Sequence, residues 1–432
     1  MKACKVGLGA CAISWLILGV NHSWADNGTE SGTASVPESE TASVPETGAK
    51  HLRPQRVPPP QGDVKRLFPE SLPISLRGWV SGGYVFNTST PDSHFNGPYN
   101  EVDRDRPQIN QVYFIAEKAL TATKGIDLGG RFDVLYGNDF FLAQSNGLER
   151  NQAAFPKWNH QIQGVALPQM YAEIGNKTFS VKAGHFYTII GYEGVPAPSN
   201  FFYSKSYSYQ FAGPFTHWGG LATAKVTSQL TFQAGVVNGW DALDRQQDNP
   251  SFLGGAKYET DDRFFTGSLA VITGEERTTI PGVFGNRTRY SALITLRPME
   301  RLEYTFHQHF SSQANGNPNG GAATWYGVDQ YLFYALHKTV KAGFRFEWFR
   351  DHDGTRVSGA PGRGSSDMLN PNFGRFAGDF FSVTGGVNYT PHPNITLRPE
   401  VRYDWSPGVG RPYNDGRSNS QVLIGINAYV QF

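Results

Sequence analysis

Two histidines and one acidic tetrapeptide are the residues of this chain whose types could bind a metal. His307 and His309 stand two apart, so in an extended chain both imidazoles project from one face, and neutral imidazole suits zinc. No acidic side chain or third histidine stands at a diagnostic spacing from them. Asp351-His-Asp-Gly354 begins like a calcium loop, but the later ligands are missing, including the glutamate at the twelfth position. We therefore expect no metal and no other cofactor.

Hydrolytic chemistry is not indicated either. Serine, histidine and acidic residues are plentiful, but no Gly-x-Ser-x-Gly turn stands between a strand and a helix. No spacing pairs a serine with a histidine and an acid in a distinctive way. The sequence therefore predicts no catalytic residues and a protein that is not an enzyme.

Rows of opposite charge suggest another chemistry, the guidance of polar solutes. Between residues 394 and 405, Arg398, Glu400 and Arg402 alternate with apolar residues, the pattern of a β-strand with two different faces. Facing rows of opposite charge would set up a transverse field that orders polar solutes and penalises apolar ones. The alternative is that the charges pair with each other and only stabilise a wall. The candidates for the lining of a pore are Arg131, Asp133, Lys182, Arg287, Arg289, Arg301, Glu303, Arg345, Glu347, Arg398, Glu400 and Arg402.

The alternation recurs in sixteen segments of about 9 to 14 residues. They begin near residues 73, 108, 126, 168, 178, 216, 229, 251, 263, 286, 300, 323, 340, 379, 394 and 421. Short turns follow the even-numbered segments and longer loops follow the odd-numbered ones. Barrels of the outer membrane have short periplasmic turns, long outer loops and strands of ~9–11 residues. An even strand number returns the chain to its starting side, and closure removes unpaired sheet edges. The sequence therefore predicts an all-β fold, a transmembrane antiparallel β-barrel of about 16 strands over residues 73–432.

The N-terminal residues predict export. Lys2 and Lys5 precede an apolar core at residues 6–20, and Ser23-Trp24-Ala25 is a small-x-small cleavage signature. We expect a signal peptide over residues 1–25, cleaved after Ala25. Residues 26–72 repeat Thr-Ala-Ser-Val-Pro-Glu twice, are rich in proline and contain few apolar residues, which predicts a disordered periplasmic linker.

Composition excludes several other classes. The net charge of +1 gives no basic surface for nucleic acid. No apolar run after residue 20 approaches the ~20 residues of a membrane-spanning helix. Both cysteines lie in the predicted signal peptide, so the mature chain would have no disulfides. The mean hydropathy of −0.41 is compatible with a membrane barrel, because only one face of each strand meets lipid.

Three features refine the barrel. The last segment alternates and ends on Phe432, which resembles the C-terminal signal for barrel insertion, and Tyr429 and Phe432 are its candidate residues. One of the long loops, 138–167 or 191–215, is expected to fold inward and narrow the pore. Aromatic residues near strand ends are expected to form two interfacial girdles. The girdle candidates are Tyr84, Tyr136, Trp240, Tyr290, Tyr304, Trp348, Tyr389 and Trp405.

A set of motifs in the middle of the chain adds a resemblance. The motifs are Pro168-Gln-Met-Tyr-Ala-Glu173, Val181-Lys-Ala-Gly-His-Phe-Tyr187, Asn200-Phe-Phe-Tyr-Ser-Lys-Ser206, Gly213-Pro-Phe-Thr-His-Trp-Gly219 and Val236-Val-Asn-Gly-Trp-Asp241. Together they resemble the putative beta-barrel porin-2 family of bacterial outer-membrane proteins, over roughly residues 76–432. The resemblance implies a porin-like barrel with no established single substrate.

The sequence therefore predicts a porin in the outer membrane of a Gram-negative-type bacterium, a water-filled channel for passive diffusion of small polar solutes or ions. The alternative is a non-conducting barrel that acts as an adhesin or structural protein through its long extracellular loops. A secreted carbohydrate-binding β protein is a third option. The expected partners are the lipid bilayer, the outer-membrane assembly machinery and small polar solutes, but no nucleic acid. A homotrimer is compatible with the sequence, although nothing in it demonstrates one.

Overall fold

A computed structural model describes residues 74–94, 96–98, 105–151, 157–158, 163–244, 249–278, 280–357, 376–408 and 410–432. The predicted signal peptide (1–25) and linker (26–72) lie outside the described residues. No helix in this described part of the chain is both long and apolar enough to cross a membrane.

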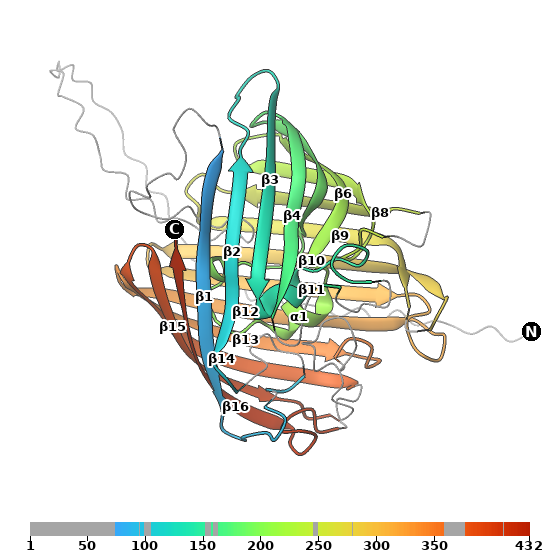
Figure 1. Ribbon diagram of the computed structural model, residues 1–432, viewed down its shortest axis with the longest axis vertical. Helices are drawn as coiled ribbons and strands as arrows, with labels where there is room; N and C mark the ends of the chain where they lie inside the picture. Colours follow the sequence, from blue (N-terminus) through green and yellow to red (C-terminus); the bar gives the residue numbers. More distant parts are fainter. Residues whose placement is uncertain are drawn as a thin grey trace, which may run out of the picture. The chain divides into compact units, whose positions relative to one another are not determined.

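The described residues form a closed antiparallel barrel of sixteen strands, in which each strand pairs with its neighbours in sequence and β1 pairs with β16 (Figure 1). The strands are β1 (Ser75–Asn87), β2 (Gln108–Lys118), β3 (Asp127–Gly137), β4 (Gly164–Gly175), β5 (Phe179–Tyr187), β6 (Thr216–Lys225), β7 (Leu230–Val237), β8 (Ser251–Glu259), β9 (Phe265–Arg277), β10 (Phe284–Met299), β11 (Leu302–Gln313), β12 (Ala323–His337), β13 (Val340–Asp351), β14 (Gly378–His392), β15 (Ile395–Trp405) and β16 (Ser420–Gln431). Three short helical turns, η1 (Asn138–Leu142), η2 (Ala197–Ser199) and α1 (Tyr207–Ala212), lie in the connections. The predicted barrel is confirmed, and the predicted strand starts agree with the observed ones to within a few residues.

The two faces of the strands differ as the alternation predicts. In β15, Arg398 and Arg402 are buried, whereas Val401 and Tyr403 between and beside them are exposed. In β16, Ile424 has a similarly exposed side chain. Large apolar side chains on the outside and polar ones on the inside are the arrangement that hydrocarbon around a barrel requires.

The connections at the two ends also differ in length. Two residues, 300–301, connect β10 to β11, and two residues, 338–339, connect β12 to β13. The connections after odd-numbered strands include the long ones at 88–107 and 188–215. The exception to the predicted rule is the connection from β9 to β10, which comprises only residues 278–283.

The barrel closes at its C-terminal residue. The Gly78 N–H donates to the Phe432 carbonyl (2.8 Å), and the Phe432 N–H donates to the Gly78 carbonyl (2.9 Å). The Phe432 ring packs against Phe114 with centroids 5.7 Å apart. A Cβ atom at Gly78 would lie 2.3 Å from the Tyr113 carbonyl oxygen and 2.8 Å from the Phe432 ring. Glycine at this position therefore allows the two ends of the sheet to meet.

Aromatic residues stack across the outer face of neighbouring strands. The ring centroids of Tyr290 and Phe310 are 6.2 Å apart, those of Phe310 and Tyr326 are 6.0 Å apart, and those of Tyr326 and Trp348 are 5.7 Å apart. Trp405 stacks on Phe381 further along (5.1 Å). Tyr290, Trp348 and Trp405 thus occupy strand positions that suit a girdle. Tyr84, Tyr136, Tyr304 and Tyr389 also lie on strands at exposed or half-buried positions.

Trp240 does not belong to a girdle, which corrects the prediction. It lies in the connection after β7 and is only 6% exposed. The guanidinium groups of Arg287 and Arg356 lie 4.7 and 5.4 Å from its ring centroid. The tryptophan follows a strand in sequence, but its loop folds back into the protein, which the sequence pattern could not indicate.

Candidate functional site: the inner segment of the lumen

The connection between β5 and β6 folds into the barrel. We call residues 188–215 the inner segment; it contains η2 and α1, and most of its side chains are buried. Its contacts extend to β2, β10, β12, β13 and β15, so it reaches strands along the part of the wall that runs from β2 past β1 and β16 to β10. We expected one of two loops, 138–167 or 191–215, to fold inward, and the second of them does so. The start of the other candidate loop, η1, is buried as well and packs with Trp79 and Tyr113.

Local sequence explains the short helix in the inner segment. The Ser206 hydroxyl accepts a hydrogen bond from the Tyr209 N–H (3.0 Å), which caps the first turn of α1. Gly213-Pro214 follows the last helical residue, and proline cannot continue a helix. A Cβ atom at Gly213 would lie 2.9 Å from Arg289 Nε, so glycine lets the chain approach this arginine closely.

Arginines of the barrel wall bind main-chain carbonyls of the inner segment. Arg398 Nη1 donates to the carbonyls of Ala197 (3.0 Å), Asn200 (3.0 Å) and Phe202 (3.2 Å). The other pairs are Arg345 Nη1 with Ser204 O (2.7 Å), Arg402 Nη1 with Lys205 O (2.8 Å) and Arg289 Nη1 with Ala212 O (2.6 Å). Buried carbonyls are costly without partners, so these charge-assisted bonds let an irregular segment lie inside the protein.

Carboxylates of the wall bind main-chain amides of the same segment. Glu400 accepts hydrogen bonds from the Tyr203 N–H (2.7 Å) and the Ser204 N–H (3.0 Å). Glu347 accepts one from the Tyr207 N–H (2.7 Å). The inner segment is thus held by both signs of charge, each matched to the main-chain group of opposite polarity.

The wall charges also pair with each other. Glu347 Oε1 lies 3.1 Å from Arg345 Nε and 3.1 Å from Arg402 Nη1, and Arg402 Nε lies 2.7 Å from Asp404 Oδ1. Glu193 of the inner segment lies 2.8 Å from Arg345 Nη1. Burial raises the pKa of the Glu193 carboxyl, but the charges of Arg345 and Lys205 outweigh it and hold that pKa below its usual range.

Side chains of three neighbouring strands form a hydrogen-bonded chain that ends on the inner segment. His307 Nε2 lies 2.9 Å from the Ser291 hydroxyl, and its Nδ1 lies 2.8 Å from Asp329 Oδ2. The Ser208 hydroxyl donates to Asp329 Oδ1 (2.8 Å) and lies 2.9 Å from His309 Nε2. The sequence did not indicate this pairing, because the three strands approach only in the folded barrel.

This arrangement has the connectivity of a serine–histidine–aspartate triad, but its hydrogen bonds connect neighbouring strands of the wall. Ser291, His307 and Asp329 are all at most 3% exposed. A nucleophile needs a substrate within reach, and burial of this degree keeps bulk solvent away from all three side chains. His307 therefore links β10 to β12 within the wall, and His309 contacts Ser208 of the inner segment.

The remaining predicted residues of the pore lining are distributed along the wall. Arg131 Nε lies 2.7 Å from Asp133 Oδ1, and both side chains are buried. Lys182 Nζ lies 4.4 Å from the Phe186 ring centroid, Arg287 donates to Gln313 Oε1 (2.7 Å), and Glu303 pairs with Arg297 (3.0 Å). Arg301 differs, because it lies exposed in the turn between β10 and β11 and therefore does not line the lumen.

Asp351 caps a turn. Its carboxylate accepts hydrogen bonds from the N–H groups of Thr355 (3.1 Å), Arg356 (2.6 Å) and Val357 (2.7 Å). The calcium-like tetrapeptide thus uses its first carboxylate to order its own loop. Among the described residues, no three His, Cys, Asp or Glu side chains gather as they would around a metal ion.

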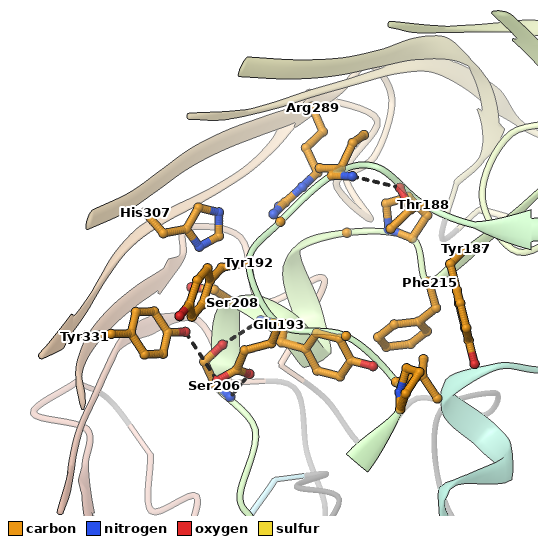
Figure 2. A pocket seen from close by; sticks show the side chains of 18 residues that line it. Tyr187, Thr188, Tyr192, Glu193, Ser206, Ser208, Phe215, Arg289, His307 and Tyr331 are labelled. Carbon is orange, nitrogen blue, oxygen red and sulfur yellow. Dashed lines mark hydrogen bonds between the residues drawn. The ribbon is translucent and has the colours of Figure 1, made fainter. Parts of the chain in front are cut away.

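A small cavity lies between the two limbs of the inner segment and the wall. Its volume is about 30 Å³. Figure 2 shows His307 and Tyr331 on one side of it and Tyr187 and Phe215 on the other. The Tyr331 hydroxyl donates to Glu193 Oε1 (3.2 Å) at its edge.

Asp139 gives the site a pH dependence. It lies in η1 and accepts hydrogen bonds from Gln111 Nε2 (2.6 Å) and Asn110 Nδ2 (3.4 Å), and Gln111 also donates to the Val195 carbonyl of the inner segment (2.8 Å). Burial raises the pKa of Asp139 to about 6. The folded state therefore binds the proton of the Asp139 carboxyl more tightly than the unfolded state does. The resulting contribution to the free energy of unfolding is fully present below about pH 4 and is lost as the pH rises to about 6.

We expect Asp139→Asn to remove this dependence. Between pH 4 and pH 6 the free energy of unfolding of the wild type should fall relative to that of the variant, by at most about 3 kcal/mol. Urea titrations of the detergent-folded barrel at several pH values measure the difference. Parallel curves for the two proteins would contradict the assignment.

Several solved structures of outer-membrane proteins are similar to this chain. The outer membrane channel DcaP of Acinetobacter baumannii has 12% sequence identity, a TM-score of 0.53 and coverage of 83% of this chain and 97% of its own. The anion-selective porin from Comamonas acidovorans has 8% identity, a TM-score of 0.54 and coverage of 83% and 99%. The trimer form of OmpT from Vibrio cholerae has 8% identity, a TM-score of 0.51 and coverage of 83% and 99%. These similarities establish the fold, and no curated protein sequence matches the chain.

A closed sixteen-strand barrel with an apolar outer face and a segment folded into its lumen defines the class of outer-membrane porins. The family model described as "Putative beta-barrel porin-2, OmpL-like" matches residues 73–432, and the chain belongs to this family. The chain is therefore an outer-membrane β-barrel porin, and its family and fold indicate a channel rather than an enzyme.

Proposed function

We propose that the protein conducts small polar solutes or ions passively and that the inner segment narrows its lumen. The observation that carries this proposal is the fixed position of residues 188–215 inside the barrel, held by arginines and carboxylates of the wall. A segment held in this way reduces the cross-section without closing the barrel wall itself. In this proposal, solutes cross by passive diffusion without coupling to an energy source.

The wall charges take two roles in this proposal. Arg289, Arg345, Glu347, Arg398, Glu400 and Arg402 hold the inner segment. Charges further along the wall, such as the half-buried pair of Arg297 and Glu303, face more water and act on the passing solute. In this proposal, the electric field in the lumen comes from charged wall residues that do not bind the inner segment.

Reconstitution of the purified protein in a planar lipid bilayer tests conduction. Stable ohmic steps in potassium chloride are the expected result. If no current is recorded although the protein migrates as a folded, heat-modifiable band, the conducting function is wrong.

A second candidate, a non-conducting barrel that binds partners through its outer loops, is favoured by one observation. Trp325, Phe349 and Phe380 of the wall are fully buried in an apolar cluster with Tyr207 and Phe211 of α1. An apolar core inside a barrel lumen carries no water. The bilayer measurement separates the two candidates, because the second predicts silence.

We propose that Phe432 and Tyr429 act as the insertion signal recognised by the assembly machinery. Phe432 supports this as the closing residue of the sheet, whereas Tyr429 faces inward, with the Arg398 guanidinium 5.0 Å from its ring centroid. We expect Phe432→Ala to lower the amount of folded protein in the outer membrane several-fold. Tyr403→Ala, which alters a lipid-facing ring elsewhere, is the control. Equal amounts of folded protein for both variants would contradict the proposal.

The remaining proposals concern the context of the barrel. We propose export by a signal peptide cleaved after Ala25, a periplasmic linker over residues 26–72, and a Gram-negative-type host. We also propose a homotrimer, for which the trimeric form of OmpT with the same fold offers support. N-terminal sequencing of the mature protein and cross-linking in membranes test these points.

A further inference from the structure

The charged side chains near the short turns of the barrel differ from those near its other end. Outer-membrane barrels place their short turns in the periplasm, so we call the space inside this end of the barrel the periplasmic vestibule. Several ion pairs of the strands surround it. They are Arg77–Glu117, Lys118–Asp127 (2.9 Å), Lys257–Glu259 (2.7 Å) and Arg297–Glu303 (3.0 Å). In each pair the positive and the negative charge compensate each other.

Three lysines and a glutamate occupy further inward positions at the same strand ends. Lys182 of β5 lies opposite Glu173 of β4 in the strand register, so these two charges offset each other. Lys225 of β6 is exposed and Lys341 of β13 is half-buried, and neither forms an ion pair with another described residue. Lys341 Nζ lies 4.7 Å from the Phe333 ring centroid, and an aromatic ring attracts a cation without cancelling its charge. The vestibule therefore carries an excess of positive charge.

This excess acts from two sides of the vestibule. Lys225 shares the inward face of its strand with the buried Leu221, and Lys341 shares that of its strand with the buried Arg345. Because β6 and β13 are seven strands apart in a barrel of sixteen, the two lysines lie on nearly opposite parts of the wall. The short turns add five basic and three acidic residues, namely Lys124, Lys177, Arg263, Arg301, Lys338, Asp261, Asp262 and Glu300.

At the other end of the lumen, charges of opposite sign are paired within the wall. Glu276 and Arg287 are half-buried, and the closest oxygen and nitrogen of the two side chains are 3.9 Å apart. A buried network with two charges of each sign comprises Arg345, Glu347, Arg402 and Asp404. Paired charges produce a weaker field in the lumen than single ones, so the lysines of the vestibule should dominate the field that an ion meets.

We propose that the periplasmic vestibule makes the channel prefer small inorganic anions to cations, with Lys225 and Lys341 supplying the excess positive charge. The inference rests on the proposed function, since it names the ions that the same channel favours. Charged side chains that line a pore of low-dielectric walls concentrate ions of the opposite sign and exclude ions of the same sign. The lysines need no contact with the ion, because their field extends over about a Debye length.

The test uses the full-length mature protein in a planar lipid bilayer that separates two concentrations of potassium chloride. The reversal potential gives the permeability ratio of chloride to potassium. We expect a ratio of about 3 near 0.1 M salt and a lower ratio near 1 M, because the Debye length falls from roughly 10 Å to roughly 3 Å. Ohmic steps with a ratio at or below about 1 near 0.1 M salt would overturn the anion preference while leaving conduction intact. Silence in wild type and variants alike would instead overturn the proposed function and the preference with it.

Two matched double variants locate the preference in the vestibule. Lys225→Gln combined with Lys341→Gln removes the excess charge and should bring the ratio to about 1. Arg411→Gln combined with Arg417→Gln removes two exposed charges from the outer connection 406–419 and should leave the ratio unchanged. An equal fall in both double variants would contradict the role of the vestibule.

A single variant keeps the test decisive if the vestibule double variant does not fold. Lys225 is exposed, so Lys225→Gln should fold like the wild type and lower the ratio by roughly half of the difference expected for the double variant. The heat-modifiable band of the variant checks its folding. A folded Lys225→Gln protein with the wild-type ratio would show that this lysine does not set the preference, and the proposal would be wrong.

Discussion

Glu347→Ala is expected to lower the free energy of unfolding by about 3–5 kcal/mol, since breaking a buried ion pair leaves its partners uncompensated. The Glu347 carboxylate is completely buried and lies 3.1 Å from nitrogens of both Arg345 and Arg402. It also accepts hydrogen bonds from the Ser382 hydroxyl and the Tyr207 N–H. Removing it leaves two positive charges close together and an amide of α1 without its acceptor. Urea titration of the folded barrel in detergent, followed by its heat-modifiable migration, measures the loss.

Two further variants separate charge from shape at this position. Glu347→Gln keeps an oxygen for the Tyr207 N–H but removes the charge, so its effect should fall between those of the wild type and Glu347→Ala. Glu259→Ala is the exposed control, because Glu259 pairs with Lys257 at 2.7 Å with about a third of its side chain in contact with solvent. Such surface pairs contribute about 0–1 kcal/mol. If Glu347→Ala cost no more than Glu259→Ala, the interpretation of the buried pair would be wrong.

Glu347→Ala should alter the function of the protein as well as its stability. Glu347 belongs to the wall, but one of its oxygens binds the inner segment. The residues of β13 and β15 that neutralise each other's charge therefore also hold the inner segment in position. This coupling explains why charged side chains lie so deeply in this lumen: an apolar wall could not satisfy the main chain of an irregular segment.

Periodicity was sufficient to predict the barrel wall. In β15, every second residue from Thr396 to Asp404 is buried, as the alternation of charged and apolar side chains indicates. Period-two patterns survive in a barrel because each strand meets lipid on one face only. Turn length was informative for the same reason, since it depends on the side of the membrane rather than on the local sequence. The short connection after β9 shows the limit of that rule.

The contents of the lumen could be predicted only in outline. Length and aromatic content marked 138–167 and 191–215 as the two candidates for an inward loop, but they could not show that Arg398 binds three carbonyls of the second. Such contacts join residues about 200 positions apart in sequence, and main-chain partners leave no trace in side-chain patterns. The assignment of Arg398 to a water-filled lining therefore missed its main contacts. Asp329 was overlooked because its partners, His307 and Ser208, lie on other elements.

Arg398→Ala is expected to release the first limb of the inner segment and to increase the conductance at least twofold, with larger current noise. Arg398 Nη1 is shared by three carbonyls within residues 197–202, and its Nε and Nη2 bind Asn427 Oδ1 (3.0 and 2.6 Å). Hydrogen bonds from charged groups contribute about 1.5–3 kcal/mol each in isolation, but these share one nitrogen. We therefore expect the limb to lose its fixed position while the barrel remains closed. Bilayer recordings in potassium chloride measure both conductance and noise.

Arg297→Ala is the matched control for this experiment. Arg297 also lies on a strand and pairs with a carboxylate, Glu303 (3.0 Å), but its other hydrogen bonds go to the Arg263 carbonyl and the Thr266 hydroxyl rather than to carbonyls of the inner segment. Removing it changes the charge by the same amount, so an effect of lumen charge alone would appear in both variants. An effect of anchoring should appear only with Arg398→Ala. Arg398→Lys refines the comparison, because a single ammonium cannot bind Asn427 and the carbonyls as the planar guanidinium does, so it should restore the charge but only part of the wild-type conductance.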